Sequence, residues 1–487
     1  MIPKKPDTLA ATVAKYTSSH VYRHVLSAFS AFIKSKLLAP EQLGLWNLIN
    51  IIPGYSTFLH FGANECMRFM IPYHEARGEQ DKAEELIAST FYGSLFPNLA
   101  LSCGLVVYGL ASQADTVTRT GIFTMAALVV LNWYYYFSFS LLRARQNFSL
   151  IIAGNYIRST VTLFGSITLI FFFGLYGLYA AMLASYIAVI LYFEVKQPTR
   201  LRRGFDPAVF RAAIGTGLPI TLFSLVTEVI RNLDQILVSW FLGIEQLGYY
   251  AISAMAAEFL MQIPGSARDV MEPRLMAEKA SLTDEQMLRR YLFAPLLSSA
   301  YLMPFAIGPA AILVPTVVAS LLPRYTPGIA PAQIIVFGCY FLAFAYATRG
   351  IVVANRWQGQ ATAIMAGTVL VNAALCIGFI KLGFGLRGVA LGSSISCLLL
   401  ALGLVVFLRC RCNYAHRAWR RVAIGLCPPF VCTLALSIAL PLATARLQVY
   451  LAAGVNLVIF FASATALYFL AVRWLPEIRG EEEAGLR

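Results

Sequence analysis

Residues 150–173 read LIIAGNYIRSTVTLFGSITLIFFF, and residues 175–195 read LYGLYAAMLASYIAVILYFEV. Arg158 is the only charged residue of the first run, and Glu194 is the only one of the second. An α-helix of about 20 apolar residues is long enough to cross a hydrocarbon core of about 30 Å. Because lipid offers the backbone no hydrogen bonds, such a run must be helical inside a membrane. The two runs therefore predict two transmembrane helices, one on each side of Gly174.

Similar runs recur along the whole chain of 487 residues. Hydrophobic residues make up 59% and charged residues 13% of the sequence, whereas a soluble globular protein carries about 25% charged residues. We therefore predict an all-α, polytopic membrane protein with about 14 transmembrane helices. Their expected ranges are 12–38, 43–70, 86–110, 118–142, 150–173, 175–195, 209–242, 246–271, 291–316, 329–354, 361–380, 385–408, 422–444 and 449–472.

Lys and Arg are distributed unevenly over the connections between the predicted helices. If the N-terminus is cytoplasmic, 28 of the 38 lie on the cytoplasmic side, 7 lie on the opposite side and 3 lie within helices. Short cytoplasmic loops carry the excess of positive charge in membrane proteins, so we expect both termini to be cytoplasmic. A basic face against anionic lipid also explains the net charge of +14, and no nucleic-acid partner is expected.

Two short sequences recur at nearly the same offset. Glu-Gln-Leu-Gly occurs at Glu41–Gly44 and again at Glu245–Gly248, in each case after the first helix of a predicted set of six. Gly-Leu-x-Gly occurs at Gly174–Gly177 and again at Gly385–Gly388, in each case between the fifth and sixth helices of a set. The matching positions predict an internal repeat of six helices.

The repeat predicts two six-helix lobes, residues 1–205 and 206–410, followed by residues 411–487 with two further helices and a cytoplasmic tail. Because six is an even number, both lobes enter the membrane in the same direction. Parallel repeats related by an axis along the membrane normal are a transporter architecture, in which a central cavity is expected between the lobes.

The first predicted helix carries polar residues at spacings of three and four, so they share one stripe of the helix. They are Tyr16, His20, Arg23, His24, Ser27 and Lys34. A charge inside a span costs about 2.5–3.5 kcal/mol and usually marks function. We assign His20, Arg23 and His24 to a cavity that receives an anion. Lys34 has the alternative of extending to the outer interface.

The helix over 209–242 carries Glu228, Arg231 and Asp234 on one stripe. Neighbours in this series are three residues apart, so Arg231 has the alternative role of neutralising the two carboxylates. In the functional interpretation Arg231 binds substrate, and Glu228 and Asp234 serve coupling or gating. The sequence leaves both interpretations open.

Charged pairs also end the second helix of each lobe. Glu65 and Arg68 lie near the end of the first of these helices, and Arg268 and Asp269 lie near the end of the other. We interpret them as a cytoplasmic gate or, alternatively, as structural ion pairs.

Catalytic motifs are missing from the sequence. It contains no P-loop, no Gly-x-Ser-x-Gly elbow and no His-Glu-x-x-His. Cys410, Cys412 and His416 offer too few ligands for a closed zinc site. We therefore expect no enzyme activity, no metal and no cofactor.

The stretch Leu37–Trp46 reads LLAPEQLGLW, and it is followed by Gly62-Ala63 and by Arg77-Gly78-Glu79 ahead of the third predicted helix. These segments resemble the bacterial polysaccharide flippases of the Wzx type. That family, which includes the O-antigen flippases, belongs to the multidrug/oligosaccharidyl-lipid/polysaccharide exporter superfamily. The family pattern at the first segment is approximately Leu-Leu-Gly-Pro-Glu-x-Tyr/Phe-Gly-Leu, and Ala39 departs from its usual glycine.

The resemblance implies alternating-access translocation of oligosaccharide repeat units, linked to undecaprenyl diphosphate, across the bacterial inner membrane. These units would serve synthesis of exopolysaccharide or of lipopolysaccharide (O-antigen). The head group would meet Arg23, His20, His24 and Arg231 in a cationic cavity, because guanidinium and imidazolium groups suit diphosphates. Membrane lipids are further partners, and the resemblance leaves open a polysaccharide polymerase and a chain-length regulator.

Three alternatives remain at this stage. A multidrug or small-cation antiporter of the same superfamily usually binds cations through acidic residues, and the first helix has none. A peptidoglycan-precursor flippase usually carries an arginine shortly after a proline in the second helix, whereas Gly54–Phe58 follow Pro53 here. A membrane-embedded enzyme acting on polyprenyl sugars is the third.

Overall fold

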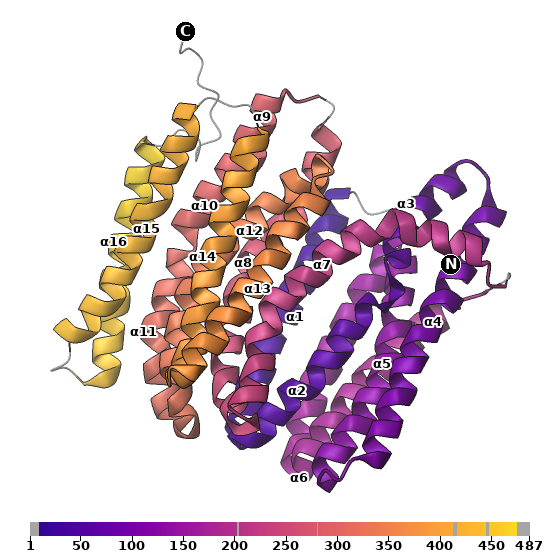
Figure 1. Ribbon diagram of the computed structural model, residues 1–487, viewed down its shortest axis with the longest axis horizontal. Helices are drawn as coiled ribbons and strands as arrows, with labels where there is room; N and C mark the ends of the chain where they lie inside the picture. Colours follow the sequence, from indigo (N-terminus) through magenta and orange to yellow (C-terminus); the bar gives the residue numbers. More distant parts are fainter. Residues whose placement is uncertain (1–8, 202–203, 280, 413–415, 445–447, 475–487) are drawn as a thin grey trace. The chain divides into compact units, whose positions relative to one another are not determined.

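The computed structural model describes residues 9–201, 204–279, 281–412, 416–444 and 448–474, except for some side chains inside helices. All regular elements in these residues are helical (Figure 1). They are α1 (Leu9–Leu37), α2 (Pro40–Ser56), η1 (Thr57–His60), α3 (Ala63–Ala76), α4 (Gln80–Ala111), α5 (Thr116–Ala144), α6 (Phe148–Lys196), α7 (Pro207–Phe241), α8 (Ile244–Glu278), α9 (Asp284–Leu288), η2 (Arg289–Phe293), α10 (Ala294–Leu302), α11 (Pro304–Leu321), η3 (Pro323–Gly328), α12 (Ile329–Ala354), α13 (Gln358–Lys381), α14 (Gly385–Arg411), α15 (His416–Ala443) and α16 (Val449–Trp474).

Within the described residues, ten helices are long and apolar enough to cross a membrane. α6 is one of them, and its 49 residues contain both spans predicted around Gly174. Gly174 has φ 56° and ψ −132°, a conformation that only glycine adopts readily. Residues 12–37 and 246–271 are also helical, but these two helices are not among the ten. The predicted all-α, multi-pass membrane architecture is confirmed.

The predicted helix over 43–70 is not continuous. α2 ends at Ser56, a 3₁₀ turn follows, and α3 begins at Ala63. Phe61 and Gly62 between them have φ values of 51° and 101°. A Cβ atom on Gly62 would lie 2.3 Å from the backbone of Gly217 in α7. The break therefore needs glycine both for its left-handed turn and for the close approach to α7.

The chain divides into two compact units, Met1–Glu228 and Val229–Arg487, and the division falls inside α7. We call them unit 1 and unit 2. The lobe boundaries expected at 205/206 and 410/411 stay a prediction. In unit 1, α5 packs against α2, α3, α4 and α6, and α1 packs along α6. Buried aromatic and aliphatic side chains on α5 and α6 fill the space between them.

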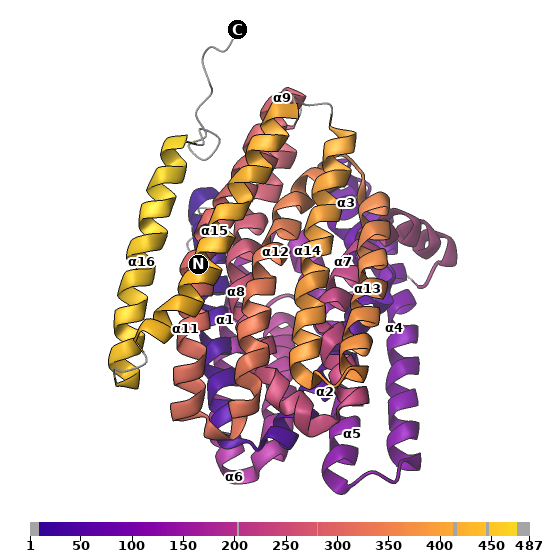
Figure 2. The same ribbon diagram turned by 60° about the vertical axis from the view of Figure 1, so that its left-hand side comes forward.

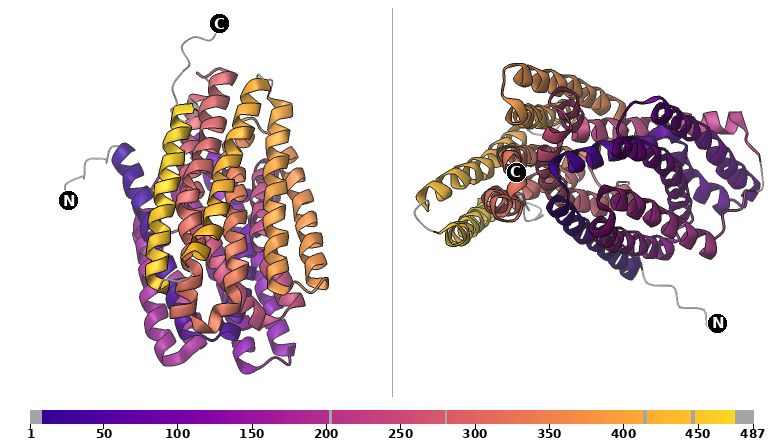
Figure 3. Two further views of the ribbon diagram at one scale, coloured as in Figure 1. Left: turned by 90° about the vertical axis from the view of Figure 1, so that its left-hand side faces the viewer. Right: turned by 90° about the horizontal axis from the view of Figure 1, so that it is seen from below.

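In unit 2, α12 packs against both α8 and α14, and α13 packs on the far side of α14 (Figure 2). The two C-terminal helices, α15 and α16, pack on one another and on α11 (Figure 3, yellow). Phe460 of α16 is fully buried in the cluster that joins these helices. α12 is thus the central helix of unit 2, as α5 is of unit 1.

Both repeated sequences occupy matching local structures. Each copy of Glu-Gln-Leu-Gly lies in the first turn of a helix, α2 or α8, and buries its leucine, Leu43 or Leu247. Gly174 and Gly385 begin the two copies of Gly-Leu-x-Gly, with φ values of 56° and 54°. The sequence echoes therefore have conformational reasons: a helix start in one case and a positive φ in the other.

Candidate functional site

α1 lies against α6 in unit 1 through aromatic and hydroxyl contacts. The rings of Tyr22 and Tyr156 meet edge to face, with 4.9 Å between their centroids. Arg23 and His24 follow on α1, and both side chains are half-buried. The side chain of His20 lies outside the described part of the structure. Two of the three cationic residues assigned to the anion cavity are thus placed on the helix that packs against α6.

Arg158 of α6 lies between two tyrosine rings. Its guanidinium carbon is 4.3 Å from the ring centroid of Tyr186 and 4.8 Å from that of Tyr135, which is cation–π distance. Its Nη2 atom donates a hydrogen bond of 2.7 Å to the Tyr186 hydroxyl. Among the described residues no carboxylate forms an ion pair with Arg158. The charge is therefore held by phenols rather than neutralised by an acid.

A chain of hydrogen bonds continues from Tyr186 to the broken helix α2. The Tyr186 hydroxyl donates to Asn132 Oδ1 at 2.8 Å, and Asn132 Nδ2 donates to the carbonyl oxygen of Pro53 at 2.7 Å. The helical partner of that carbonyl would be the Thr57 N–H, which instead bonds within the last turn of α2. Ser56 Oγ supplies a second donor at 2.8 Å. Side chains thus satisfy a carbonyl that the helix break releases.

Tyr136 connects this cluster to the predicted site residues of unit 1. Arg158, Arg23 and Glu228 all interact electrostatically with its hydroxyl. The backbone carbonyl of Glu228 accepts a hydrogen bond of 3.4 Å from Tyr55. Tyr136 exposes 39% of its surface, so the cluster extends to the surface of unit 1. The structure therefore places Arg23 and Glu228 within electrostatic range of one tyrosine, Tyr136, which the sequence did not single out.

Asp234 of α7 forms a second polar cluster, in unit 2. One carboxylate oxygen accepts a hydrogen bond of 2.6 Å from the Tyr250 hydroxyl, and the other accepts one of 2.8 Å from the Gln235 amide. Tyr250 is completely buried. Arg231, whose side chain is exposed, and Asp234 both interact electrostatically with Cys339. Asp234 is thus a carboxylate held by a buried phenol.

Two further buried polar side chains lie beside the Tyr250 hydroxyl, and a third contacts one of them. Ser393 and Cys376 lie next to it, and Cys376 Sγ lies 3.0 Å from Asn372 Oδ1 and 3.8 Å from Ser393 Oγ. These residues come from α13 and α14. The cluster therefore joins α7 and α8 to α13 and α14 within unit 2.

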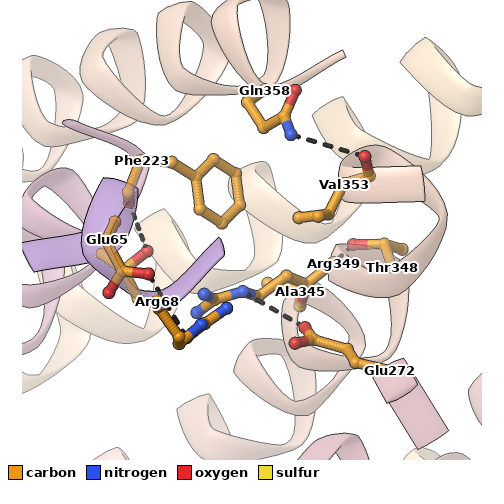
Figure 4. Close-up of polar contacts among 10 residues, drawn as sticks. Glu65, Arg68, Phe223, Glu272, Ala345, Thr348, Arg349, Val353 and Gln358 are labelled. Carbon is orange, nitrogen blue, oxygen red and sulfur yellow. Dashed lines mark hydrogen bonds and ion pairs between the residues drawn. The ribbon is translucent and has the colours of Figure 1, made fainter. Parts of the chain in front are cut away.

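Three of the four residues assigned to a gate have described side chains, and these lie in an ion pair or against an aromatic ring. Arg68 forms an ion pair of 3.3 Å with Glu65, one turn earlier on α3 (Figure 4). Arg268 of α8 lies over the ring of Tyr346, 5.2 Å from its centroid. The side chain of Asp269 lies outside the described residues. The pairing of Glu65 with Arg68 fits the structural alternative, and the gating role stays a prediction.

A small pocket lies beside Arg268 in unit 2. Its walls are largely apolar, with Met271 and Leu275 among them, and Tyr346 and Arg268 also line it. Glu272 at its edge pairs with Arg349 of α12 at 3.3 Å (Figure 4). This ion pair joins α8 to α12.

The motif Arg77-Gly78-Glu79 forms the turn between α3 and α4. Gly78 has φ 74°, and the Glu79 carboxylate lies 2.7 Å from His74 Nδ1 and 3.2 Å from Lys82 Nζ. The hydrogen bond with His74, followed by that with Lys82, lowers the pKa of the Glu79 carboxyl below its ordinary value. The motif thus builds the turn between the two helices.

The sequence indicates Arg158 as the only charge in its apolar run, but it does not indicate the tyrosines that contact it. A single arginine inside an apolar run is a recognisable signal, because such a charge must be stabilised by protein or water. The partners carried no comparable signal, because tyrosine is common in this chain, with 24 copies. Only packing shows which of them meet Arg158.

Comparison with known proteins identifies one family by sequence. Residues 34–326 match the model of a family described as polysaccharide biosynthesis protein. No curated protein matches the chain by sequence.

Solved structures share the fold. A lipid II flippase, MurJ, in an inward closed conformation has a TM-score of 0.70 and 14% identity, covering 94% of this chain and 99% of its own. An inward-facing multidrug resistance transporter of the MATE family and MOP superfamily has a TM-score of 0.63 and 15% identity. The match covers 82% of this chain and 96% of the transporter. A MOP superfamily transporter from Pyrococcus furiosus, described by the reverse polarity of its binding pocket, has a TM-score of 0.55 and 15% identity. The match covers 84% of this chain and 95% of that transporter. The fold is therefore that of the MOP superfamily.

Proposed function

The chain belongs to the polysaccharide biosynthesis protein family, and from this membership we propose that it flips polyprenyl-diphosphate-linked oligosaccharides across a membrane. The family match over residues 34–326 is the observation that carries the proposal. The family is one of transporters and not of enzymes. The product would be exopolysaccharide or lipopolysaccharide O-antigen, and the membrane would be the bacterial inner membrane, with both termini cytoplasmic.

The proposed substrate has an anionic head group that cannot cross hydrocarbon unaided. Arg23, His20, His24 and Arg231 are proposed to contact its diphosphate, because charge-assisted hydrogen bonds to phosphate are strong. The undecaprenyl chain would stay in the bilayer while the head group crosses. Membrane lipids are the surrounding partners, and a polymerase and a chain-length regulator would take over the product.

Transport is proposed to follow alternating access. Glu228 and Asp234 would couple it to proton movement or gate it together with Arg231. Glu65, Arg68, Arg268 and Asp269 would open and close the cytoplasmic end. The hydrogen bond that Asp234 accepts from Tyr250 supports a coupling role, since an ionisable residue inside a span usually marks function.

Deletion of the gene tests the proposal directly. Lipid-linked repeat units should accumulate on the cytoplasmic face, and surface polysaccharide should fall. If the units reach the outer leaflet at the normal rate in a strain without a second flippase, the proposed function is wrong.

The assigned binding residues are tested by complementation with an Arg23→Ala/Arg231→Ala double variant. We expect at least a 10-fold loss of surface polysaccharide at equal expression, on the order of one lost charge-assisted contact. The matched control is Arg119→Ala/Arg324→Ala, which removes one exposed arginine from each unit. Full output from the first double variant would remove Arg23 and Arg231 from the site.

Two siblings of the superfamily are distinguished by substrate. The fold likeness to a multidrug transporter favours testing efflux of cationic dyes. The fold likeness to a lipid II flippase favours testing accumulation of peptidoglycan precursors. Dye efflux or precursor accumulation that depends on the protein, without a polysaccharide phenotype, would replace the proposed substrate.

A further inference from the structure

Within the part of the chain that the structure describes, Arg158 has no charged partner that explains its place in an apolar run. Inserting such a charge costs about 2.5–3.5 kcal/mol. Two cation–π contacts and one hydrogen bond to a phenol offset part of that cost. The described residues supply no carboxylate to neutralise it. The site therefore keeps a positive charge inside unit 1.

The guanidinium also keeps hydrogen-bonding capacity. An arginine has five N–H groups in a planar fork, and its hydrogen-bond partners here are the hydroxyls of Tyr186 and Tyr135. The remaining donors match two oxygens of a phosphate group, which arginine binds in a bidentate manner. Arg23 adds a second positive charge that acts on the same tyrosine, Tyr136, and Glu228 adds one negative charge, so the three groups together carry a net charge of about +1. Because Tyr136 is partly exposed, the cluster is continuous with the surface of unit 1.

The hydrogen bonds that leave this cluster run in one direction. Arg158 donates to Tyr186, Tyr186 donates to Asn132, and Asn132 donates to the Pro53 carbonyl. Each bond in such a chain polarises the next, so the loss of the first donor weakens the others. The chain ends where α2 breaks, at a carbonyl without its helical partner.

We propose that Arg158 binds the diphosphate of the transported lipid and that binding loosens the break in α2. The inference rests on the proposed function for the identity of the lipid, but the anion site itself does not. A diphosphate that binds the remaining N–H groups of Arg158 draws the guanidinium away from the two rings, so Tyr186 loses its donor. The Asn132–Pro53 bond then weakens, and the segment from Gly54 to Gly62 opens more often. Arg158 is thus a binding residue, whereas Tyr186 and Asn132 are positioning residues.

The binding half is tested with farnesyl diphosphate and the full chain in phosphatidylcholine nanodiscs. Arg158→Gln should weaken binding by about 10-fold or more, as loss of a charge-assisted, bidentate contact predicts. The affinity of Arg158→Lys for farnesyl diphosphate should lie between those of the wild type and Arg158→Gln, because lysine keeps the charge but lacks the planar guanidinium. Arg119→Gln removes an exposed arginine of α5 and should bind within twofold of the wild type. Binding of farnesol, which lacks the phosphates, should not change with any of the three substitutions.

The coupling half is tested by amide hydrogen exchange of the peptide over residues 54–62. In the wild type, farnesyl diphosphate should speed exchange of this peptide. Tyr186→Phe keeps the ring beside Arg158 but removes the hydroxyl. Because no Arg158–Tyr186 bond then has to break, this variant should bind the probe at least as tightly as the wild type. It should exchange the peptide quickly without the probe and show no further change on binding.

Each result tests one part of the proposal: the anion site, the coupling to α2 or the proposed function. Equal binding of farnesyl diphosphate by Arg158→Gln, or by Arg158→Lys if the glutamine variant does not fold, overturns the anion site. A Tyr186→Phe variant that still speeds exchange on binding overturns the coupling. If binding depends on Arg158 but lipid-linked glycans reach the outer leaflet without the protein, the proposed function fails while the site stands.

Discussion

The polar clusters of the two units hold opposite charges with the same kind of residue. In unit 1 the Tyr186 hydroxyl accepts a hydrogen bond from Arg158. In unit 2 the Tyr250 hydroxyl donates one to Asp234. A phenol serves in both because it is donor and acceptor at once. The charge of the neighbour, and not the tyrosine itself, decides what each cluster can bind.

The difference fits a division of labour. The cationic cluster suits an anionic head group, whereas the acidic cluster suits a small cation or a proton. The repeated sequences Glu-Gln-Leu-Gly and Gly-Leu-x-Gly occur in both units and build helix starts and turns. The repeated sequences therefore build the same helix starts and turns in both units, whereas the charge of the polar cluster differs between the units.

The largest effect is expected from Gly217→Ala, which would disrupt the close approach of α7 to the break between α2 and α3 in unit 1. The new Cβ atom would lie 1.9 Å from the Gly62 carbonyl oxygen, and both partners are backbone. We expect loss of monodisperse, folded protein in detergent. Gly215→Ala, two residues earlier on α7, meets nothing within 4 Å and should raise stability by about 0.5–1 kcal/mol. Equal stability of the two variants would show that α7 does not depend on this close approach.

Asp234→Asn tests whether the two clusters do different work. The variant should reduce polysaccharide output at least 10-fold, as expected for loss of a coupling group, on the order of 1.4 kcal/mol or more. Binding of farnesyl diphosphate should stay within twofold, in contrast to Arg158→Gln. Asp284→Asn, an exposed carboxylate of unit 2, is the control. Weakened probe binding by Asp234→Asn would merge the clusters into one site.

Removing one tyrosine hydroxyl from each cluster shows how much each cluster contributes to the free energy of unfolding. Tyr250→Phe should destabilise the protein by about 1.5–3 kcal/mol, the usual value for a hydrogen bond to a charged group. Tyr186→Phe should cost less, because Arg158 keeps its contacts with two rings. Thermal unfolding measures both variants. A Tyr250→Phe/Asp234→Asn double variant should show a non-additive loss, since the two residues share the bond; additive losses would deny that they are coupled.

The smallest effect concerns helix caps, one in each unit. Asp115 caps α5 by accepting from the amides of Val117 and Thr118, and Thr283 caps α9 by accepting from Gln286. The Thr118 side chain and these amides hold the pKa of Asp115 below its ordinary value. The cap therefore stabilises α5 above the unfolded pKa of about 3.9 and is lost as the pH falls through the lower, folded value.

Asp115→Ala should lower the melting temperature by a few degrees near neutral pH and by nothing once the carboxylate is protonated. Thr283→Ala should cause a small decrease that does not change with pH, because a hydroxyl does not titrate in this range. Melting curves between pH 3 and pH 7 compare the two, and identical pH profiles would contradict the role of the Asp115 charge.

Sequence patterns predicted the elements well where the signal was local. Apolar length predicted the spans, and Gly174 marked the turn inside α6. The prediction failed over 43–70, because the break at residues 57–62 depends on the approach of Gly217 from a helix about 150 residues away. Among the site residues, Arg23 and Asp234 were visible as charges in apolar surroundings. The hydroxyls beside Arg158 and Asp234 were not, because the chain contains many tyrosines.

The sequence by itself determined the membrane location, the helical architecture and the positions of rare charges. These follow from the cost of placing polar groups in hydrocarbon, which acts on each segment separately. Only the tertiary structure decided that Arg158 lies between two phenols, that its hydrogen bonds reach the Pro53 carbonyl, and that Asp234 meets Tyr250. These contacts join residues that are distant in the chain, so helix packing selects the partners and no local pattern records the choice.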